Sequence, residues 1–562
     1  MISKTKLGQL LVDSKIITSE QLTKALAEQQ RTGEMLGITL QRLGFVEEEA
    51  IYMPILAQQI GVEFANLKSL NIPMEAIGRI PAKLASHYKV MPVRLENNTL
   101  SVAMTKPLDI HTLDELSLSL DAKIKPVLAA EKDILEAIRK YYGVGADTLE
   151  QMMGNIHTTQ APGTKVKDLE DADEDASISK FFNQILLEAY KDKASDIHIE
   201  PFEEQLKVRY RVDGVLYDAQ VPQNIKHFKD SINSRIKILS NLNIAEKRLP
   251  QDGRFNVRVG DVDLDLRVSF LPSAFGESVV IRLLSSTRLY SFDEFGLSKD
   301  EQDILERMIH KPHGIIFITG PTGSGKSTTL YSCLAKINTV HKKIITIEDP
   351  IEYQLPGIIQ IQINPRIGLT FASGLRSMLR HDPDIMMVGE VRDFETAEIA
   401  IRIALTGHLV LSTLHTNDAA SAVTRLLDMG IEQFLIASSV NCLIAQRLVR
   451  RVCPKCRTTV FVDPQMLREF GVHEKNLVDI TAYEGQGCEA CRFTGYVGRE
   501  SIFEFLIITD EIRNLILARV SATQIKQKAV EQGMKTLRQN GWEKIKRGIT
   551  TVSEVIGVTK EE

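Results

Sequence analysis

Apolar positions recur at helical spacing in the first sixty residues of the chain. Leu22 and Leu26 are four positions apart, as are Ile51 and Ile55, so each pair lies on one face of a helix. The polar run Thr18-Ser19-Glu20 precedes the first pair and is typical of a helix start. The two stretches correspond at an offset of 29 residues: Leu7 with Leu36, Gly8 with Gly37, Ile16 with Phe45 and Gln29 with Gln58. We therefore expect a duplicated helical bundle over residues 1–62.

The pattern changes to strand alternation further along the chain. Val90–Glu96 and Thr99–Thr105 are strand-like and flank Asn97-Asn98, a pair that tolerates the positive φ angles of a tight turn. This hairpin predicts a small α+β module over residues 63–145. The following KDLEDADEDA run, which begins at Lys167, is too acidic and too poor in apolar residues to bury a core. We expect residues 146–176 to form a flexible linker.

Two further domains are predicted from the remaining periodicity. Apolar spacing resumes at Ile178 and predicts a helix to about Lys191, followed by strands around Ile197, Val208, Val215, Val268 and Val280. We assign residues 177–290 to a second α+β domain. Beyond it, apolar runs alternate with helical stretches, as in a parallel sheet covered by helices: Gly314–Thr319, Lys343–Ile347, Ile385–Val388 and His408–Thr413. They predict an α/β domain over residues 291–562, with helices over 507–562.

Composition bounds the class of protein. A chain of 562 residues exceeds one hydrophobic core and, at about 150 residues per domain, suggests three or four units. Hydrophobic residues make up 43%, and no run approaches the roughly 18 apolar residues of a membrane span. The N-terminal MISKTKLGQL lacks the apolar core of a secretory signal, so we expect the cytoplasm, with membrane contact only through partners. A net charge of -5 gives no global attraction to nucleic acid, and none is expected as a partner.

The motif that carries chemistry begins at Gly320. The segment GPTGSGKS follows the apolar run GIIFIT and opens a helix, which is the context of a phosphate-binding loop. Its backbone N–H groups can cradle phosphate, the Lys326 ammonium can neutralise the β- and γ-oxygens, and the Ser327 hydroxyl can ligate Mg²⁺. An accidental glycine-rich turn is the alternative, which this context disfavours. The predicted nucleotide-binding residues are Gly320, Pro321, Thr322, Gly323, Ser324, Gly325, Lys326, Ser327 and Thr328.

Phosphoryl transfer also needs carboxylates near the phosphate loop. Glu390 follows the apolar run IMMV, as in a Walker B element, although Gly389-Glu390 stands where an Asp is usual. Glu348, Asp349 and Glu352 likewise follow a predicted strand, and the carboxyl ends of parallel strands meet at one edge of a sheet. Either cluster alone is also compatible with a solvated loop.

Two histidines bracket another apolar strand. His408 precedes the run LVLSTL and His415 follows it. Lone histidines are usually structural, but this pair is a candidate sensor of the γ-phosphate.

Four cysteines form two knuckles with metal-ligand spacing. Cys453 and Cys456 make one C-x-x-C pair, and Cys488 and Cys491 make the other. Four soft ligands favour a closed tetrahedral Zn²⁺ site, which has no open position for a substrate and is therefore structural, so we expect a zinc element over residues 451–500. A redox pair is the alternative, which two matched knuckles in a cytosolic chain disfavour. The remaining cysteines lie in apolar helical patterns and are expected to be small core residues: Cys333 and Cys442.

In their order along the chain, these motifs have a known counterpart. GPTGSGKST, ITIEDPIEYQL, GLRSMLRHDPDIMMVGEVRD, TGHLVLSTLHTNDA and the four cysteines resemble the secretion ATPase superfamily of type II secretion and type IV pilus assembly. The resemblance covers residues 176–562. It implies a RecA-like P-loop ATPase core preceded by a PAS-like α+β domain, in a homohexamer that binds nucleotide between these domains. The cofactors that it implies are ATP, Mg²⁺ and Zn²⁺.

The resemblance also implies roles for the site residues. Lys326 and Ser327 contact phosphate and Mg²⁺, and Glu390 is the Walker B acid. Glu348 and Glu352 are the Asp-box acids, of which we choose Glu352 to polarise water, and the histidines at 408 and 415 form the His box. The family takes arginines from the preceding domain to neutralise the γ-phosphate, and an ordinary salt bridge is the alternative role for each candidate. The candidates are Arg209, Arg211, Arg248, Arg254 and Arg267.

The cysteine element and the TGYVGRESIFEFL that follows it are similar to the extension and secretion branch rather than to retraction ATPases. That branch implies an ATPase that assembles pilin or pseudopilin fibres, with an inner-membrane platform protein and a cytoplasmic docking domain as partners. The amino-terminal repeat resembles a cyclic-di-GMP-binding domain, but Lys6 and Met35 stand where that domain has Arg, and Ser14-Lys15 replaces the Gly found as Gly44. Arginine stacks on and forks to guanine and phosphate as neither substitute can. We expect a docking or hexamer-assembly module, and cyclic-di-GMP binding remains the alternative.

Two other functions compete with this one. A DNA-handling P-loop motor would need a basic channel lining, and a nucleotide-gated scaffold would have little turnover. The zinc element and the N-terminal repeat favour the secretion or assembly motor over the DNA motor. Type II secretion and type IV pilus assembly share every motif above, so both remain open.

Overall fold

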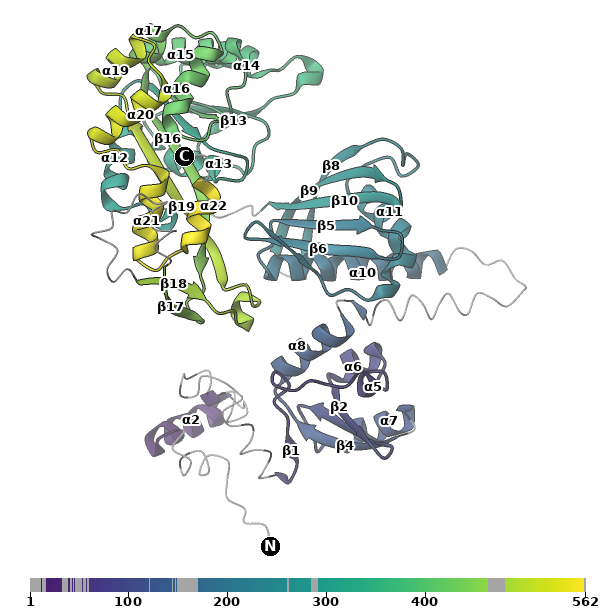
Figure 1. Ribbon diagram of the computed structural model, residues 1–562. Coiled ribbons are helices and arrows are strands. Elements are labelled where there is room, and N and C mark those ends of the chain that lie inside the picture. Colours follow the sequence, from purple (N-terminus) through teal and green to yellow (C-terminus); the bar gives the residue numbers. More distant parts are fainter. Residues whose placement is uncertain are drawn as a thin grey trace. The chain divides into compact units, whose positions relative to one another are not determined.

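The computed structural model describes residues 17–32, 61–120, 122–143, 170–259, 262–284, 292–462 and 481–559, with a few single positions before residue 61 and near residue 146. It divides into two compact units, residues 1–283 and 284–562, which are described separately (Figure 1). Most of the predicted repeat within residues 6–58, and most of the predicted linker, lies outside the described residues. Among the residues described, no helix combines the length and the apolar character needed to cross a bilayer.

The first part of the N-terminal unit contains a helix, α2 (Ser19–Thr32), and a four-stranded sheet. The Thr18 hydroxyl accepts the Gln21 amide at 3.2 Å and Gln21 Oε1 accepts the Thr18 amide at 2.8 Å, so the predicted helix start is confirmed as a reciprocal cap. Asn97 and Asn98 have φ of 46° and 61° between the paired strands β2 and β3, as predicted. The elements are β1 (Glu63–Phe64), α5 (Met74–Ile77), α6 (Ala82–Tyr88), β2 (Met91–Glu96), β3 (Thr99–Met104), α7 (Ile110–Leu120), β4 (Lys123–Leu128) and α8 (Glu131–Tyr142), with sheet order β1-β4-β3-β2.

The second part is a six-stranded sheet with two helices on one face (Figure 1). Alternate residues of β9, such as Leu266 and Phe270, are buried and pack with Phe181 and Ile232 of the helices, because successive side chains of a strand point to opposite faces. Helix α10 begins at Glu170, eight residues before the predicted Ile178. The elements are α10 (Glu170–Lys191), β5 (Asp196–Pro201), β6 (Leu206–Val212), β7 (Val215–Asp218), α11 (Lys229–Leu239), β8 (Gln251–Val259), β9 (Val262–Ser273) and β10 (Gly276–Leu284), with sheet order β7-β6-β5-β10-β9-β8.

The C-terminal unit is built on a seven-stranded sheet of order β13-β12-β14-β15-β11-β16-β19. Its neighbouring strands pair in parallel except β16 with β19, which are antiparallel. The four predicted apolar runs form central strands, so the predicted α/β class is confirmed. The strands are β11 (Gly314–Thr319), β12 (Ile344–Glu348), β13 (Ile359–Gln362), β14 (Ile385–Val388), β15 (Leu409–Leu414), β16 (Val440–Val452) and β19 (Tyr496–Ile507).

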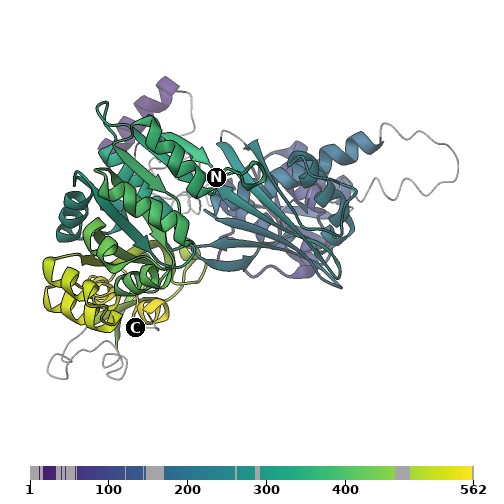
Figure 2. The same ribbon diagram turned by 90° about the horizontal axis from the view of Figure 1, so that it is seen from above.

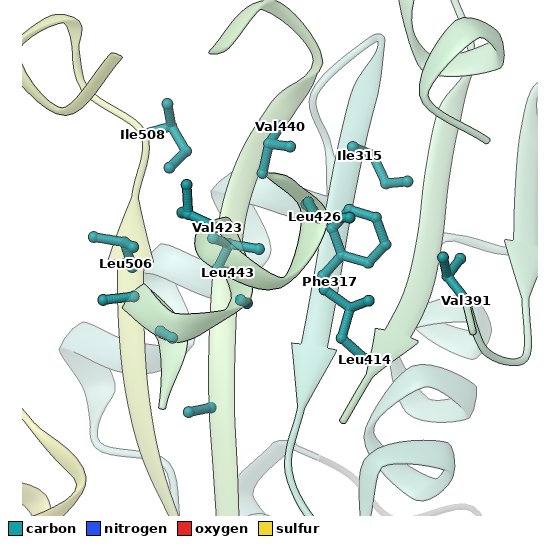
Figure 3. Packing of buried hydrophobic residues seen from close by; sticks show 14 of the residues in the cluster. Ile315, Phe317, Val391, Leu414, Val423, Leu426, Val440, Leu443, Leu506 and Ile508 are labelled. Carbon is teal, nitrogen blue, oxygen red and sulfur yellow. The ribbon is translucent and has the colours of Figure 1, made fainter. Parts of the chain in front are cut away.

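Helices cover both faces of this sheet (Figure 2). Ile315 and Phe317 of β11 belong to one core cluster and Ile316 and Ile318 to the other, so a strand buried on both sides reads as a continuous apolar run. Figure 3 shows Phe317 close to Leu426 of α16 within the first cluster. The helices are α12 (Lys299–Ile309), α13 (Lys326–Ile337), α14 (Phe371–Met378), α15 (Phe394–Leu405), α16 (Ala419–Asp428), α17 (Gln433–Ser439), α19 (Asp510–Leu517), α20 (Ala522–Glu531), α21 (Leu537–Lys546) and α22 (Val552–Thr559).

One of the two cysteines expected in helical patterns lies elsewhere. Cys333 is buried on α13, but Cys442 is buried in the middle of the sheet, on β16. The helical prediction for Cys442 is wrong, because a short apolar run reads the same in a buried strand as in a buried helix. Both residues are core positions, as expected.

Candidate active site

The loop between β11 and α13 owes its shape to glycine. Gly320, Gly323 and Gly325 have φ of 151°, 81° and 89°, which side-chain-bearing residues rarely adopt. A Cβ at Gly320 would also lie 2.5 Å from the Gln446 carbonyl oxygen of β16. Glycine therefore lets the loop close against the neighbouring strand, while Pro321, Thr322 and Gly323 remain exposed on its open side.

Lys326, the first residue of α13, folds back into this loop. Its Nζ donates to the carbonyls of Gly320 at 2.7 Å and Pro321 at 2.9 Å, and the residue is 9% exposed. Burial lowers the pKa of Lys326 to about 8; Glu390 opposes this shift and Arg447 adds to it. A buried ammonium with donors turned to the loop carbonyls is chemically matched to an anion that would enter the loop.

Two hydroxyls complete the fit to a phosphate and its metal ion. Ser324 is 3% exposed, and its Oγ has no hydrogen-bond partner among the described residues. A buried hydroxyl without a partner is costly, so a ligand oxygen in the loop would satisfy it. Ser327 is exposed one residue beyond Lys326, where its hydroxyl is available to Mg²⁺. The predicted loop residues therefore fit a Mg²⁺-bound nucleotide.

Hydrogen bonds draw the ends of four parallel strands to one edge of the sheet. The Gly389 amide donates to Ile347 O at 2.8 Å, and Thr413 Oγ1 donates to Gly389 O at 2.7 Å. The Thr416 amide donates to Thr319 Oγ1 at 2.8 Å, directly before the phosphate loop. The segments after β12, β14 and β15 are thereby held beside the segment after β11, as expected for a parallel sheet.

Glu390 lies at this edge between the phosphate loop and His415. His415 Nε2 is 3.1 Å from one Glu390 oxygen, and Arg392 Nη2 is 2.6 Å from the other. The Glu390 charge also raises the pKa of Lys326, so the two groups interact. Glycine in place of the usual Asp before Glu390 has a local reason: a Cβ on Gly389 would lie 3.3 Å from the Glu348 Cα.

The acids after β12 have unequal surroundings. Glu348 is 3% exposed and accepts hydrogen bonds from Thr346 at 2.5 Å, from Gln360 at 3.1 Å and from Tyr331. Burial raises the pKa of Glu348, although these three donors oppose the shift. Asp349 is exposed and Glu352 is half-buried. Glu348 is thus enclosed by donors, whereas Glu352 retains access to solvent.

The structure separates the two histidines of the predicted pair. β15 is parallel to β11, and Leu409 pairs with Gly314 while Leu414 pairs with Thr319. His408 therefore lies one strand length, about 20 Å, from the edge that carries the phosphate loop. It sits near the end of α15, 3.2 Å from Thr406 Oγ1. The structure does not bring His408 to the phosphate loop of its own chain, whereas His415 lies at that edge beside Glu390.

All five candidate arginines belong to residues 1–283, whereas the phosphate loop belongs to residues 284–562. Three are held by bidentate contacts with acids: Arg209 with Glu200 at 2.7 and 2.8 Å, Arg248 with Glu246 at 3.1 and 2.9 Å, and Arg254 with Asp265. The other two are Arg211, which donates to Gly214 O at 2.9 Å, and Arg267, which lies opposite Arg254 across β8 and β9.

The four cysteines meet in one group, with all four Sγ atoms within 4.8 Å of one another. Three pairs, Cys453–Cys488, Cys456–Cys491 and Cys488–Cys491, lie 3.8, 3.7 and 3.7 Å apart. A tetrahedron with Zn–S bonds of about 2.3 Å has edges of about 3.8 Å, so the spacing fits a zinc ion and is far longer than a disulfide. The amides of Cys488 and Gly495 donate to Cys491 Sγ at 3.1 and 3.2 Å, as suits a thiolate ligand.

Three residues near the site were missed by sequence reasoning. Tyr331 contacts both Asp-box acids, Gln360 contacts Glu348, and Arg447 of β16 lies near enough to Lys326 to lower its pKa. Only Tyr331 had a signal in the sequence. A tyrosine five residues after Lys326, on the buried side of a helix, needs a partner for its hydroxyl.

Comparison with known proteins identifies the family. A family model described as Type II/IV secretion system protein matches residues 171–557, which is more than half of the chain. The chain belongs to this family. A second model, described as the MshEN domain, matches residues 60–148, the segment of the four-stranded sheet. The predicted relationship to secretion ATPases is confirmed, and the MshEN match begins at the end of the N-terminal repeat rather than within it.

Relatives that match over nearly the whole chain are named either as pilus assembly ATPases or as type II secretion proteins. The chain is 43% identical over 562 residues to the Type IV pilus assembly ATPase PilB of Myxococcus xanthus, covering 99% of each chain. It is 39% identical over 565 residues to the Type II secretion system protein E of Xanthomonas campestris, covering 100% of this chain and 99% of the relative. The X-ray structure of the ATPase DotB from Legionella pneumophila shares the fold, at 24% identity and a TM-score of 0.51 over 68% of this chain and 96% of that one. The expectation of an ATPase with a RecA-like core is confirmed.

Proposed function

We propose that this chain is a cytoplasmic motor that hydrolyses ATP to ADP and phosphate and converts domain motion into assembly of pilin or pseudopilin fibres. The observation that carries the ATPase site is the meeting of Lys326, Glu390, His415 and the acids after β12 at one edge of the sheet. Fibre assembly rests on the family and on the names of its full-length relatives.

The work of hydrolysis is divided among the residues of this edge. The amides of the loop from Gly320 to Thr328 bind the phosphates, and Lys326 neutralises the β- and γ-oxygens. Ser327 and Glu390 would hold Mg²⁺, which would supply positive charge against the charge that develops on the transferred group. Glu352 orients and polarises the attacking water, and His415 holds Glu390 and reports on the γ-phosphate. Glu348 is buried and stabilises the position of these residues through its hydrogen bonds.

The arginines act from a neighbouring copy. In a homohexamer with nucleotide between domains, residues 177–290 of one chain supply one or more of the five candidate arginines to the phosphate loop of another. Mixing tests this directly. Lys326→Ala subunits keep their arginines and Arg254→Ala subunits keep their phosphate loop, so mixed oligomers should regain turnover that neither variant has alone. Wild-type turnover by all five single arginine variants would remove the arginine assignment, and absence of recovery in every mixture would exclude action from a neighbouring copy.

The remaining parts have structural and docking roles. The four cysteines hold Zn²⁺ and stabilise the segment around β17 (Arg457–Phe461) and β18 (Thr481–Gly485) without touching substrate. The N-terminal modules dock the motor on its machine, where an inner-membrane platform protein and a cytoplasmic docking domain are the partners. Micromolar binding of cyclic-di-GMP to the full chain in a calorimetric titration would replace this docking role with nucleotide sensing.

Phosphate release tests the central proposal. The wild type should release phosphate from ATP and Lys326→Ala should not, because the γ-phosphate loses its cation. Lys336→Ala is a matched control, since Lys336 lies on the same helix but pairs with the half-buried Glu306 at 3.0 Å and lies over the Phe292 ring, away from the phosphate loop. Equal turnover by the wild type and Lys326→Ala would end the enzymatic claim and leave a nucleotide-gated scaffold. In the source organism, loss of surface pili or loss of a secreted protein after deletion distinguishes the two branches.

A further inference from the structure

The helix that follows the phosphate loop carries a buried tyrosine that no step described so far uses. Tyr331 lies five residues after Lys326 on α13 and is 1% exposed. Its ring packs edge-on against Tyr353, with centroids 4.6 Å apart and planes at 76°. The phosphate-loop helix is therefore in direct contact with the segment that carries Glu352.

The Tyr331 hydroxyl is both a hydrogen-bond donor and a hydrogen-bond acceptor. It donates to the Glu348 carboxylate and accepts the backbone amide of Glu352 at 3.1 Å. A hydroxyl has one hydrogen to donate and lone pairs to accept with, so one oxygen atom connects both Asp-box acids. The connection reaches Glu352 through its backbone amide, so it fixes the position of the main chain that carries this acid.

Glu348 anchors this hydroxyl rather than facing the substrate. Besides Tyr331, its carboxylate accepts hydrogen bonds from Thr346 at 2.5 Å and from Gln360 at 3.1 Å. Gln360 in turn accepts the Leu355 amide at 2.7 Å and donates to the Tyr353 carbonyl at 3.2 Å. The network thus fixes the backbone of residues 352–355 at several points around one buried carboxylate.

We propose that Tyr331 and Glu348 are positioning residues that set the Glu352 backbone relative to the phosphate loop. The proposal rests on the proposed function, because it assigns water activation to Glu352. Lys326 and Tyr331 lie on one rigid helix, so the contact fixes the distance between the phosphate-binding end of that helix and the acid that orients water. A displacement of about 1 Å in such a group can reduce a rate roughly 100-fold without weakening ground-state binding.

Tyr331→Phe tests the proposal, because it removes one oxygen and keeps the ring that packs on Tyr353. Steady-state ATP hydrolysis by the full chain should have a kcat about 10- to 100-fold below wild type. The KM for ATP and the binding of a fluorescent ATP analogue should stay within about twofold, since the phosphate loop is untouched. Cys333→Ala, a buried change on the same helix, is the matched control and should retain the wild-type kcat.

Glu348→Gln is a second variant, and it tests the same positioning role. It should lower kcat about as much as Tyr331→Phe, whereas Glu352→Gln should lower it considerably further. Because the tyrosine and Glu348 act as one unit, the double variant Tyr331→Phe/Glu348→Gln should be no slower than the slower single variant. If Tyr331→Phe is insoluble, the comparison of Glu348→Gln with Glu352→Gln decides.

Several outcomes would overturn the proposal. They are a kcat of Tyr331→Phe within twofold of wild type, losses in the double variant that multiply, a parallel loss of kcat and nucleotide binding, or a Glu348→Gln variant as inactive as Glu352→Gln. Failure of the proposed function has a different signature, since the wild type would then hydrolyse ATP no faster than Lys326→Ala. The two failures are distinguishable within one set of assays.

Discussion

His415 Nε2 lies 3.1 Å from Glu390 Oε2, while Arg392 Nη2 binds the other oxygen of the same carboxylate at 2.6 Å. The Walker B acid is therefore held from both sides, by the end of β15 and by its own loop. Arg392 is largely exposed, but the Glu390 side chain is only 12% exposed. His415 is thus the contact through which the strand that ends beside the phosphate loop positions Glu390.

Replacement of His415 should lower the rate of ATP hydrolysis rather than the stability of the fold. His415→Ala removes one of the two contacts that orient Glu390, so we expect kcat to fall roughly 10- to 100-fold with little change in melting temperature. His408→Ala is the matched control, because His408 lies at the other end of the same strand. Its effect on kcat should be at least tenfold smaller. Equal losses in the two variants would mean that the distance from the phosphate loop does not govern their roles.

Lys326 predicts a pH-dependent step in nucleotide binding. Burial lowers the pKa of Lys326 to about 8 from its ordinary 10.5, so the nucleotide-free protein loses this proton well before an unfolded chain does. Stability from this group therefore rises with pH between about 8 and 10.5, where the unfolded chain binds more protons. Bound phosphates favour the charged ammonium and raise its pKa again, so binding above pH 8 takes up a proton.

Calorimetry in buffers of different ionisation enthalpy measures this uptake. At pH 8.5 the wild type should take up about half a proton or more on binding a non-hydrolysable ATP analogue. Lys326→Arg is charged at every accessible pH and should take up none at the concentrations where it binds. A wild type that binds without proton uptake at pH 8.5 would place the pKa of Lys326 well above 8.

A feature of the structure could be predicted where the residues that determine it lie close together in the sequence. The phosphate loop and the strands before it were predictable because glycine spacing and apolar runs are local, and each has one physical explanation. Cys442 shows the limit, since a buried strand and a buried helix share the same apolar run. The early start of α10 at Glu170 shows another, because acidic composition was read as a linker.

The site was predictable where parallel topology alone decides which residues meet. Glu390 and His415 follow strands that must end at the same edge, and they do meet. His408 lies at the opposite end of the same strand, which was not foreseen because the sequence pattern gave no weight to which end of the strand it occupies. Gln360 and Arg447 could not be predicted, because their roles depend on strand order in the sheet, which periodicity does not encode.

Removal of zinc should reduce local stability in the C-terminal unit without abolishing nucleotide binding. We expect about one zinc per chain by elemental analysis, and loss of that zinc in Cys491→Ser, whose Sγ accepts two backbone amides as well as facing the other sulfurs. Hydrogen exchange should then rise in β17 and β18. Cys442→Ala, at a buried cysteine outside the group, should keep its zinc. A metal-free wild type with unchanged exchange in this region would contradict the structural role.

Lys237 carries the last prediction, because it is one of the most deeply buried charges in the N-terminal unit. It is 1% exposed, and its Nζ donates to Glu277 Oε1 at 2.7 Å and to the Glu246 carbonyl at 2.7 Å. The carbonyl belongs to the exposed loop that carries Arg248, so the ion pair also anchors that loop. Removing one partner of a buried pair leaves the other charge uncompensated, which costs about 3–5 kcal/mol.

Lys237→Met should therefore destabilise the N-terminal unit by about that amount, and Lys237→Met/Glu277→Leu should recover most of the loss, because no lone charge remains. The chain has several domains and will not unfold in one step, so hydrogen exchange of α11 and β10 amides is the appropriate measurement. Lys247→Met is the control, since its pair with Asp230 is solvent-exposed and contributes at most about 1 kcal/mol. A double variant as unstable as Lys237→Met would mean that the Lys237 ammonium stabilises the fold as a donor to the Glu246 carbonyl rather than by balancing the Glu277 charge.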